Sequence, residues 1–177
     1  MISGLHGLDV EELIDDWDSI RHGYFLGEHD ETLLACVEEL RRARAAEPRD
    51  PDAVAFFTFG LVLMYGHVMS DAESAAADQA VVALSAVASD PAVEHPVCDH
   101  ENHPYDSEFG DFSDFDEHLE SFPVLLSLLA GDSEYEWLDL NPNSNHPDAE
   151  SHWRCPHNVA GFARSATTAI GPRPGKD

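Results

Sequence analysis

The seventeen residues from Ala53 to Met69 constrain the fold more than any other part of the chain. Their sequence is AVAFFTFGLVLMYGHVM, in which only Thr58 and His67 are polar. A helix this apolar has no side suited to water, so the rest of the protein must enclose it. At about 1.5 Å per residue it spans roughly 25 Å, less than the ~30 Å hydrocarbon core of a bilayer. We therefore expect the central helix of a soluble bundle rather than a membrane span.

Capping signals predict two helices before this stretch. Asp9 and Glu12 have the spacing of a capping box, and apolar residues follow at helical intervals. These residues are Val10, Leu13, Ile14, Trp17 and Ile20. A second helix is expected to begin at Asp30 as its N-cap. Its buried stripe would comprise Leu33, Leu34, Val37 and Leu40. Pro51 suits the first turn of the central helix.

The chain changes character after the central helix. Ser70 and Glu73 form another capping-box pattern, which opens an alanine-rich helix ending at Ala88. From residue 91 to residue 114 the sequence is rich in Pro, His and acids and lacks helical periodicity. We expect an irregular acidic insertion there.

Helical spacing returns beyond the insertion. The apolar positions are Phe115, Leu119, Phe122, Leu126 and Leu129. Pro123 should kink this helix or restart it near Ser121, and a last helix should begin near Pro156. We expect residues 171–177 to form a disordered tail. The sequence thus predicts an all-α domain over residues 1–170, a helical bundle or short helical-hairpin array of five to six helices.

The charge of the chain restricts its partners. Thirty-five Asp and Glu against nine Lys and Arg give a net charge of -26, which repels nucleic acids and anionic membrane surfaces. Such a charge favours a basic protein partner, or life in concentrated salt, where self-repulsion is screened. The N-terminus has no basic or apolar signal region, so we expect a cytoplasmic protein.

Residues 30–90 resemble tetratricopeptide repeats. A Pro-acid turn precedes a helix in which Phe56, Phe59, Gly60 and Leu63 have the large and small spacing of that family. The interval from Pro48 to Pro91 is 43 residues (91 − 48) instead of the family's roughly 34, so helix lengths must differ. The resemblance implies protein or peptide binding on a helical surface. An ordinary antiparallel bundle is the alternative.

Two Cys/His clusters suggest a zinc site. Residues 98–103 read CDHENH and residues 152–157 read HWRCPH. Thiolate and imidazole together suit Zn²⁺, and four such ligands close a structural site. The candidate ligands are Cys98, His100, His103, Cys155 and His157. A Cys98–Cys155 disulfide, or unrelated surface histidines and buried cysteines, are the alternatives.

An enzyme could use the same clusters. If three protein ligands left a water on the metal, Glu101 or Asp99 could act as the general base of a hydrolysis. The sequence contains no HExxH motif and no CxxC pair to support a metal-dependent hydrolase.

The insertion also contains a candidate partner site. Acids alternate there with aromatic side chains, and we select Phe109, Asp111, Phe112 and Asp114. Acids that frame aromatic anchors would suit a basic, apolar-lined cleft, as in an immunity protein or a nucleic-acid mimic. The alternative is an acidic loop whose phenylalanines pack onto the domain. Our interpretation is a non-enzymatic protein-binding module with a structural zinc site. We expect its partner to be a protein, and the charge of the chain favours a basic one.

Overall fold

Helices form the regular secondary structure of the part of the chain that the structure describes. The computed structural model describes residues 2, 5, 7–23, 29–70, 74–90, 119–120, 122–131 and 156–173, and no strand occurs among them. Within these residues the helices are α1 (Val10–His22), α2 (His29–Ala45), α3 (Pro51–Leu63), α4 (Tyr65–Ser70), α5 (Ala75–Ala88), α7 (Phe122–Leu129) and α9 (Pro156–Ile170). The predicted all-α fold is confirmed.

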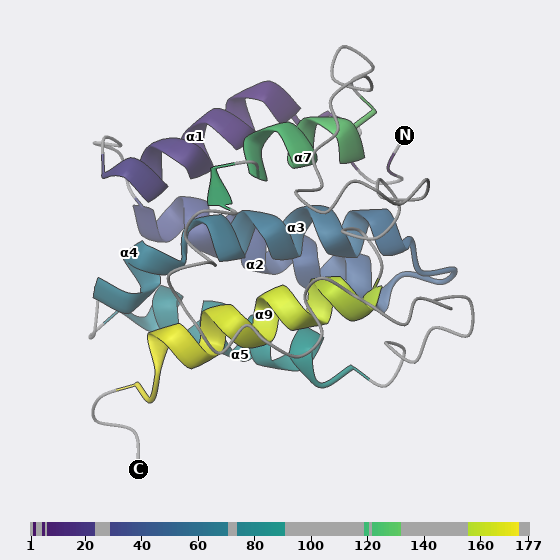
Figure 1. Cartoon of the computed structure of the whole chain (residues 1–177). Helices are drawn as coiled ribbons and strands as arrows, with labels where there is room; N and C mark the ends of the chain where they lie inside the picture. Colours follow the sequence, from purple (N-terminus) through teal and green to yellow (C-terminus); the bar gives the residue numbers. More distant parts are fainter. Residues whose placement is uncertain are drawn as a thin grey trace, which may run out of the picture.

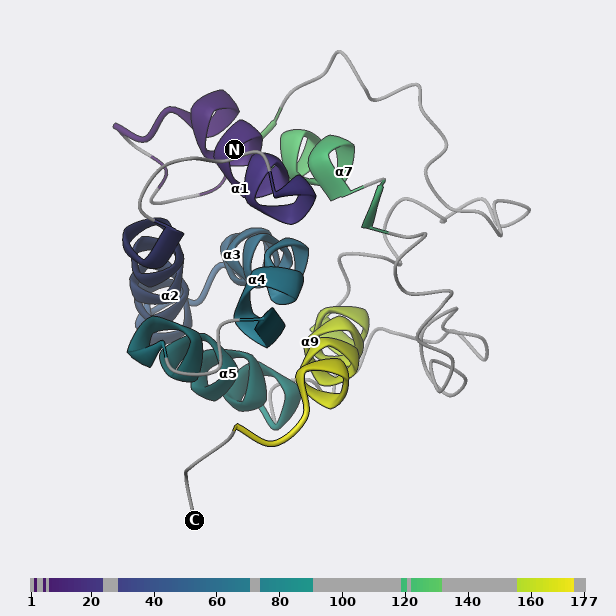
Figure 2. The same cartoon turned by 90° about the vertical axis from the view of Figure 1, so that its left-hand side faces the viewer.

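The apolar helix α3 lies at the centre of the molecule. Viewed nearly along its axis, α1, α2, α5, α9 and α7 surround α3 and α4 (Figure 2). Helix α3 contacts every one of these helices, and α1 and α7 pack together on one side of it (Figure 1). Ala53 and all the residues from 55 to 63 are buried. The expected enclosure of this helix is therefore confirmed.

The predicted single helix over residues 53–69 is wrong in one respect. Helix α3 ends at Leu63, Met64 caps it with φ −88° and ψ 6°, and α4 starts in a new direction at Tyr65 (Figure 1). Gly66 follows one residue later and lowers the helix propensity of this stretch. The break explains why the structure has one more helix, within the described ranges, than the upper number predicted. None of the described helices has both the length and the apolarity that a membrane crossing requires.

Helix α1 follows its capping signals closely. The side chain of Asp9 accepts a hydrogen bond from the Glu12 amide at 3.1 Å. At the other end Gly23 adopts φ 72°, the left-handed conformation that closes a helix, and its amide reaches the Ile20 carbonyl. Ile14, Trp17 and Ile20 are buried, as their spacing predicts.

The start of α2 differs from the prediction. The helix begins at His29, so Asp30 lies in its first turn and is not its N-cap. The Asp30 carboxylate instead accepts a hydrogen bond from the Ser74 hydroxyl at 3.0 Å. Leu34 is 37% exposed, and Cys36 takes its place in the buried stripe. One of the four predicted stripe positions is therefore wrong. The error arises because Leu33 and Leu34 both lie at helical spacing from Val37.

Ser74, not Ser70, caps α5. Its side-chain oxygen accepts a hydrogen bond from the Ala77 amide at 3.1 Å. The expected cap at Ser70 is therefore wrong, because Ser70 belongs to α4. Asp30 and Ser74 tie the first turn of α2 to the N-terminus of α5.

Phenylalanines join the last two described helices to the centre. Phe59 of α3 lies 5.1 Å from Phe122 of α7 and 5.5 Å from Phe162 of α9, measured between ring centroids. Phe122 and Phe162 lie 5.2 Å apart. The start of α7 at Phe122, with Pro123 in its first turn, and the start of α9 at Pro156 agree with the sequence prediction.

The chain beyond α9 is held in place at least as far as Arg173. Its guanidinium donates hydrogen bonds to the Asp78 carboxylate at 2.8 Å and to the carbonyls of Val68 and Ser74 at 2.9 and 3.2 Å. The expected disordered tail therefore does not begin at residue 171. Residues 174–177 lie outside the described residues.

Candidate functional site

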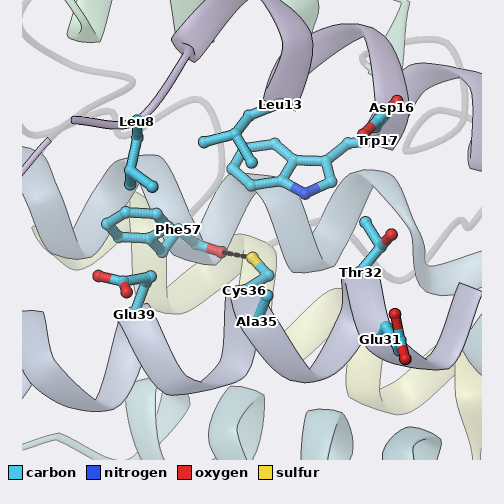
Figure 3. Close-up of a pocket in the computed structure, with 10 residues that line it drawn as sticks. All are labelled: Leu8, Leu13, Asp16, Trp17, Glu31, Thr32, Ala35, Cys36, Glu39 and Phe57. Atoms are coloured by element: carbon cyan, nitrogen blue, oxygen red, sulfur yellow. Dashed lines mark hydrogen bonds between the residues drawn. The ribbon is translucent and has the colours of Figure 1, made fainter.

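A pocket of about 300 Å³ opens between α1 and α2, with α3 behind it (Figure 3). Helix α1 packs mainly against α7, whereas α2 packs along α3 and α5. Helices α1 and α2 therefore leave a space between them above Phe57. The pocket is lined by Leu8, Leu13, Asp16, Trp17, Glu31, Thr32, Ala35, Cys36, Glu39 and Phe57. Cavities of this size typically bind a small ligand or one or two side chains of a partner.

The indole of Trp17 forms one wall of the pocket. The side chain is only 1% exposed and packs on Phe56 and Phe57, with ring centroids 5.4 and 6.4 Å away. Its six-membered ring lies against the backbone of Gly60, which has no side chain to block it. These contacts fix the plane of the indole.

The indole N–H of Trp17 has no hydrogen-bond partner among the described residues. Figure 3 shows the nitrogen at the edge of the ring that faces α2, toward Cys36 and Thr32. An indole nitrogen can only donate, and a buried donor without an acceptor costs about 1–3 kcal/mol. The wall of the pocket thus contains an unsatisfied donor in a fixed position, covered by the neighbouring side chains.

Carboxylates occupy the rim of this pocket. Asp16 comes from α1, and Glu31 and Glu39 come from α2 (Figure 3). Arg42 pairs with Glu39 at 2.7 Å and so neutralises part of the rim. No described Lys or Arg lies within ion-pair distance of Asp16. The rim therefore keeps a negative charge.

The negative charge extends along the outer face of α1. Glu11, Glu12 and Asp15 are exposed and, within the described part of the chain, form no ion pair. In contrast, the arginines near the end of α2 are paired with acids. Arg44 and Arg49 both reach the Asp90 carboxylate, at 3.3 and 2.7 Å.

Cys36 is not a nucleophile of this pocket. Burial, and after it the charge of Glu39, raise the pKa of the Cys36 thiol far above its ordinary value of 9.0, while a hydrogen bond with the Leu61 backbone opposes the shift. The thiol donates a hydrogen bond to the Phe57 carbonyl at 3.3 Å. A thiol that stays protonated is inert toward electrophiles.

Two histidines, His29 and His67, pack together outside the pocket. The rings of His29 and His67 lie 4.6 Å apart at right angles, and His67 Nε2 is 3.9 Å from the Asp30 carboxylate. His67 is half-buried, with its side chain 16% exposed. No group of three or more His, Cys, Asp or Glu side chains suited to a metal occurs among the described residues.

The site residues predicted from the sequence are not placed by the structure. Four of the five candidate zinc ligands, Cys98, His100, His103 and Cys155, lie outside the described residues. His157 belongs to the first turn of α9, but its side chain is not described. The candidate partner residues Phe109, Asp111, Phe112 and Asp114 also lie outside the described residues, as do Asp99 and Glu101.

The pocket itself was not predicted. Trp17 reads as one more apolar residue of the α1 stripe, and Asp16 reads as part of a solvated face. Only their position opposite α2 reveals a shared cavity. Comparisons of the chain with protein-family models, with curated proteins and with solved structures gave no match.

Proposed function

We propose that the protein is a non-enzymatic binding module whose pocket between α1 and α2 receives an apolar side chain of a basic protein partner. The observation that carries this proposal is an apolar cavity of about 300 Å³ rimmed by carboxylates from two helices. An apolar residue of the partner would occupy the space above Phe57. Neighbouring Lys or Arg residues would pair with Asp16 and Glu31.

The charge of the whole chain supports a basic partner. A net charge of -26 attracts cations over long distances and accelerates their encounter with the protein. Rim charges of this kind contribute more to the association rate and to specificity than to affinity, whereas the buried apolar contact supplies most of the affinity. The tetratricopeptide-like spacing within residues 30–90 implies the same class of function.

The proposal is tested with three short labelled peptides that share one scaffold. Their central residues are Arg-Leu-Arg, Arg-Ser-Arg and Glu-Leu-Glu, and binding is followed by fluorescence anisotropy at an ionic strength of about 0.1 M. We expect the Arg-Leu-Arg peptide to bind best, because only it offers both an apolar side chain and flanking cations. Equal binding of the Arg-Ser-Arg peptide would show that the pocket takes no part.

A pair of double variants with the same charge locates the interaction. Asp16→Asn with Glu31→Gln removes two rim charges, and Glu47→Gln with Glu120→Gln removes two exposed charges elsewhere. At ionic strengths near 0.1 M charges act over about 10 Å, so the rim variant should lose about threefold to tenfold in affinity and the control less than about twofold. Equal losses in the two variants would reduce the interaction to unspecific attraction by net charge.

A further inference from the structure

The unpaired N–H of Trp17 restricts the chemistry of the ligand more narrowly than the acidic rim does. We infer that this N–H donates a hydrogen bond to a neutral carbonyl oxygen of the ligand, so that the pocket recognises a cation, an apolar body and an acyl oxygen together. The inference rests on the proposed function, because it concerns the same pocket. Its basis is a buried donor that has no acceptor among the described residues.

The surroundings of the N–H select a neutral acceptor. A ligand carboxylate would meet the charge of Asp16, which no described Lys or Arg neutralises, and like charges at short distance repel. An ammonium or guanidinium group suits the rim but has no acceptor to offer to the indole. The acceptor must therefore be a group separate from the cation, and the carbonyl of a peptide or amide is the common neutral one.

The acceptor reaches Trp17 from the side of α2. The nitrogen faces Thr32 and Cys36 across the pocket (Figure 3), and Thr32 is half-buried. Because Trp17 is held by Phe56, Phe57 and Gly60, the indole itself has little room to move. The neighbouring side chains must part to admit the oxygen, and side-chain changes of this kind are common when proteins bind ligands.

A set of three small probes separates the contributions of the cation, the apolar group and the carbonyl to binding. Leucinamide carries an ammonium group, an isobutyl group and an amide carbonyl. Isoamylamine keeps the cation and the branched chain but lacks the carbonyl, and 4-methylpentanamide keeps the carbonyl and the chain but lacks the cation. A protein partner presents the same three groups as leucinamide, through an apolar residue beside a basic one.

The readout is the indole ¹H–¹⁵N resonance of Trp17 in the wild-type protein. The chain has three tryptophans, so Trp17→Phe assigns the resonance by its absence. Leucinamide should shift this resonance and bind about fivefold to tenfold more tightly than isoamylamine, since it satisfies a buried donor. In Trp17→Phe, which keeps an aromatic ring in the wall, the two amines should bind equally, and a thermal melt confirms that the variant is folded.

The outcomes distinguish this inference from the proposed function. If both amines bind the wild-type protein equally and the Trp17 resonance does not move, the inference is overturned, whether or not the Arg-Leu-Arg peptide binds. If neither amine binds while the peptide does, the inference is likewise overturned and the proposed function stands. If leucinamide shifts the resonance but the peptide fails to bind, the inference holds for a free amino amide and the proposed protein partner is lost.

Discussion

The ring of Trp17 lies directly on the backbone of Gly60. A Cβ atom at position 60 would stand only 2.8 Å from Cζ3 of the indole, closer than any real contact of that kind. The close approach joins α1 to α3 and sets the wall of the pocket. A side chain at position 60 would therefore disturb both the core and the proposed site.

Gly60→Ala should lower the free energy of unfolding by about 1–3 kcal/mol, because overpacking a dense core forces side chains from their preferred positions. Denaturant unfolding measures the change. Gly66→Ala is the matched control, since a Cβ at that position of α4 would meet nothing within 4 Å. Alanine has the higher helix propensity, so the control should be neutral or more stable by up to about 1 kcal/mol. Equal effects of the two substitutions would contradict the close Trp17–Gly60 packing.

Thr58 should be replaceable by valine with a gain in stability. The residue is fully buried in α3, and its hydroxyl has no hydrogen-bond partner among the described residues. Thr58→Val has nearly the same shape and removes the unpaired group, so unfolding should cost about 1 kcal/mol more. Thermal unfolding tests this expectation. Thr168→Val is the control, because its exposed hydroxyl donates a hydrogen bond to the Arg164 carbonyl. A destabilised Thr58→Val would show that the hydroxyl has an acceptor after all.

Local signals were enough to predict most of the helices. Asp9 and Gly23 mark the ends of α1 because capping depends on residues a few positions apart, and the burial of Val159 and Phe162 follows from helical spacing alone. The same reasoning failed where two local solutions are nearly equal. The choice between Leu34 and Cys36 in α2 depended on where the other helices lie.

The pocket depends on contacts that no local pattern contains. Trp17 and Gly60 are 43 positions apart (60 − 17), and nothing in either segment indicates that they touch. Arg173 likewise looks like part of a polar tail, although it bonds to Asp78. The packing of distant elements determines both the Trp17–Gly60 contact and the Arg173–Asp78 contact. The sequence alone could therefore predict the elements but not the site.

Arg173 should fasten the end of the chain to the bundle. Its side chain is only 8% exposed and bonds to Asp78 and to two backbone carbonyls. Arg173→Met keeps the length of the side chain but leaves these acceptors unpaired, so we expect a loss of about 1–3 kcal/mol in unfolding free energy. Arg164→Met on the exposed face of α9 should change it by less than about 0.5 kcal/mol. If both variants unfold with the same free energy as the wild-type protein, the contacts of Arg173 contribute nothing to stability.

The buried thiol of Cys36 should make the protein less stable in alkali. Because burial raises the pKa of this thiol, the folded state keeps a proton that the unfolded state loses above the ordinary pKa of 9.0. Stability from this group is complete below pH 9 and falls above it, by about 1.4 kcal/mol for each pH unit. Urea unfolding between pH 8 and pH 10 measures the slope, with pH values chosen as about one unit on either side of that pKa. Cys36→Ala should be less stable at pH 8 but should lose less on going to pH 10. An unchanged slope in the variant would assign the alkaline loss to other groups.

Zinc binding by the two Cys/His clusters stays a prediction that metal removal can decide. If Cys98 and Cys155 contribute thiolates to one structural site, untagged protein should contain about one zinc ion per chain. Cys98→Ser and Cys155→Ser should each lose most of it. Cys36→Ala should retain it, because that thiol is buried in the core and bonded to the Phe57 carbonyl. A metal held only by the folded state raises stability, so a chelator should lower the melting temperature of the wild-type protein and leave the two serine variants unchanged. Equal zinc content in all four proteins would exclude the site, and a melting temperature indifferent to chelator would exclude a structural role for the ion.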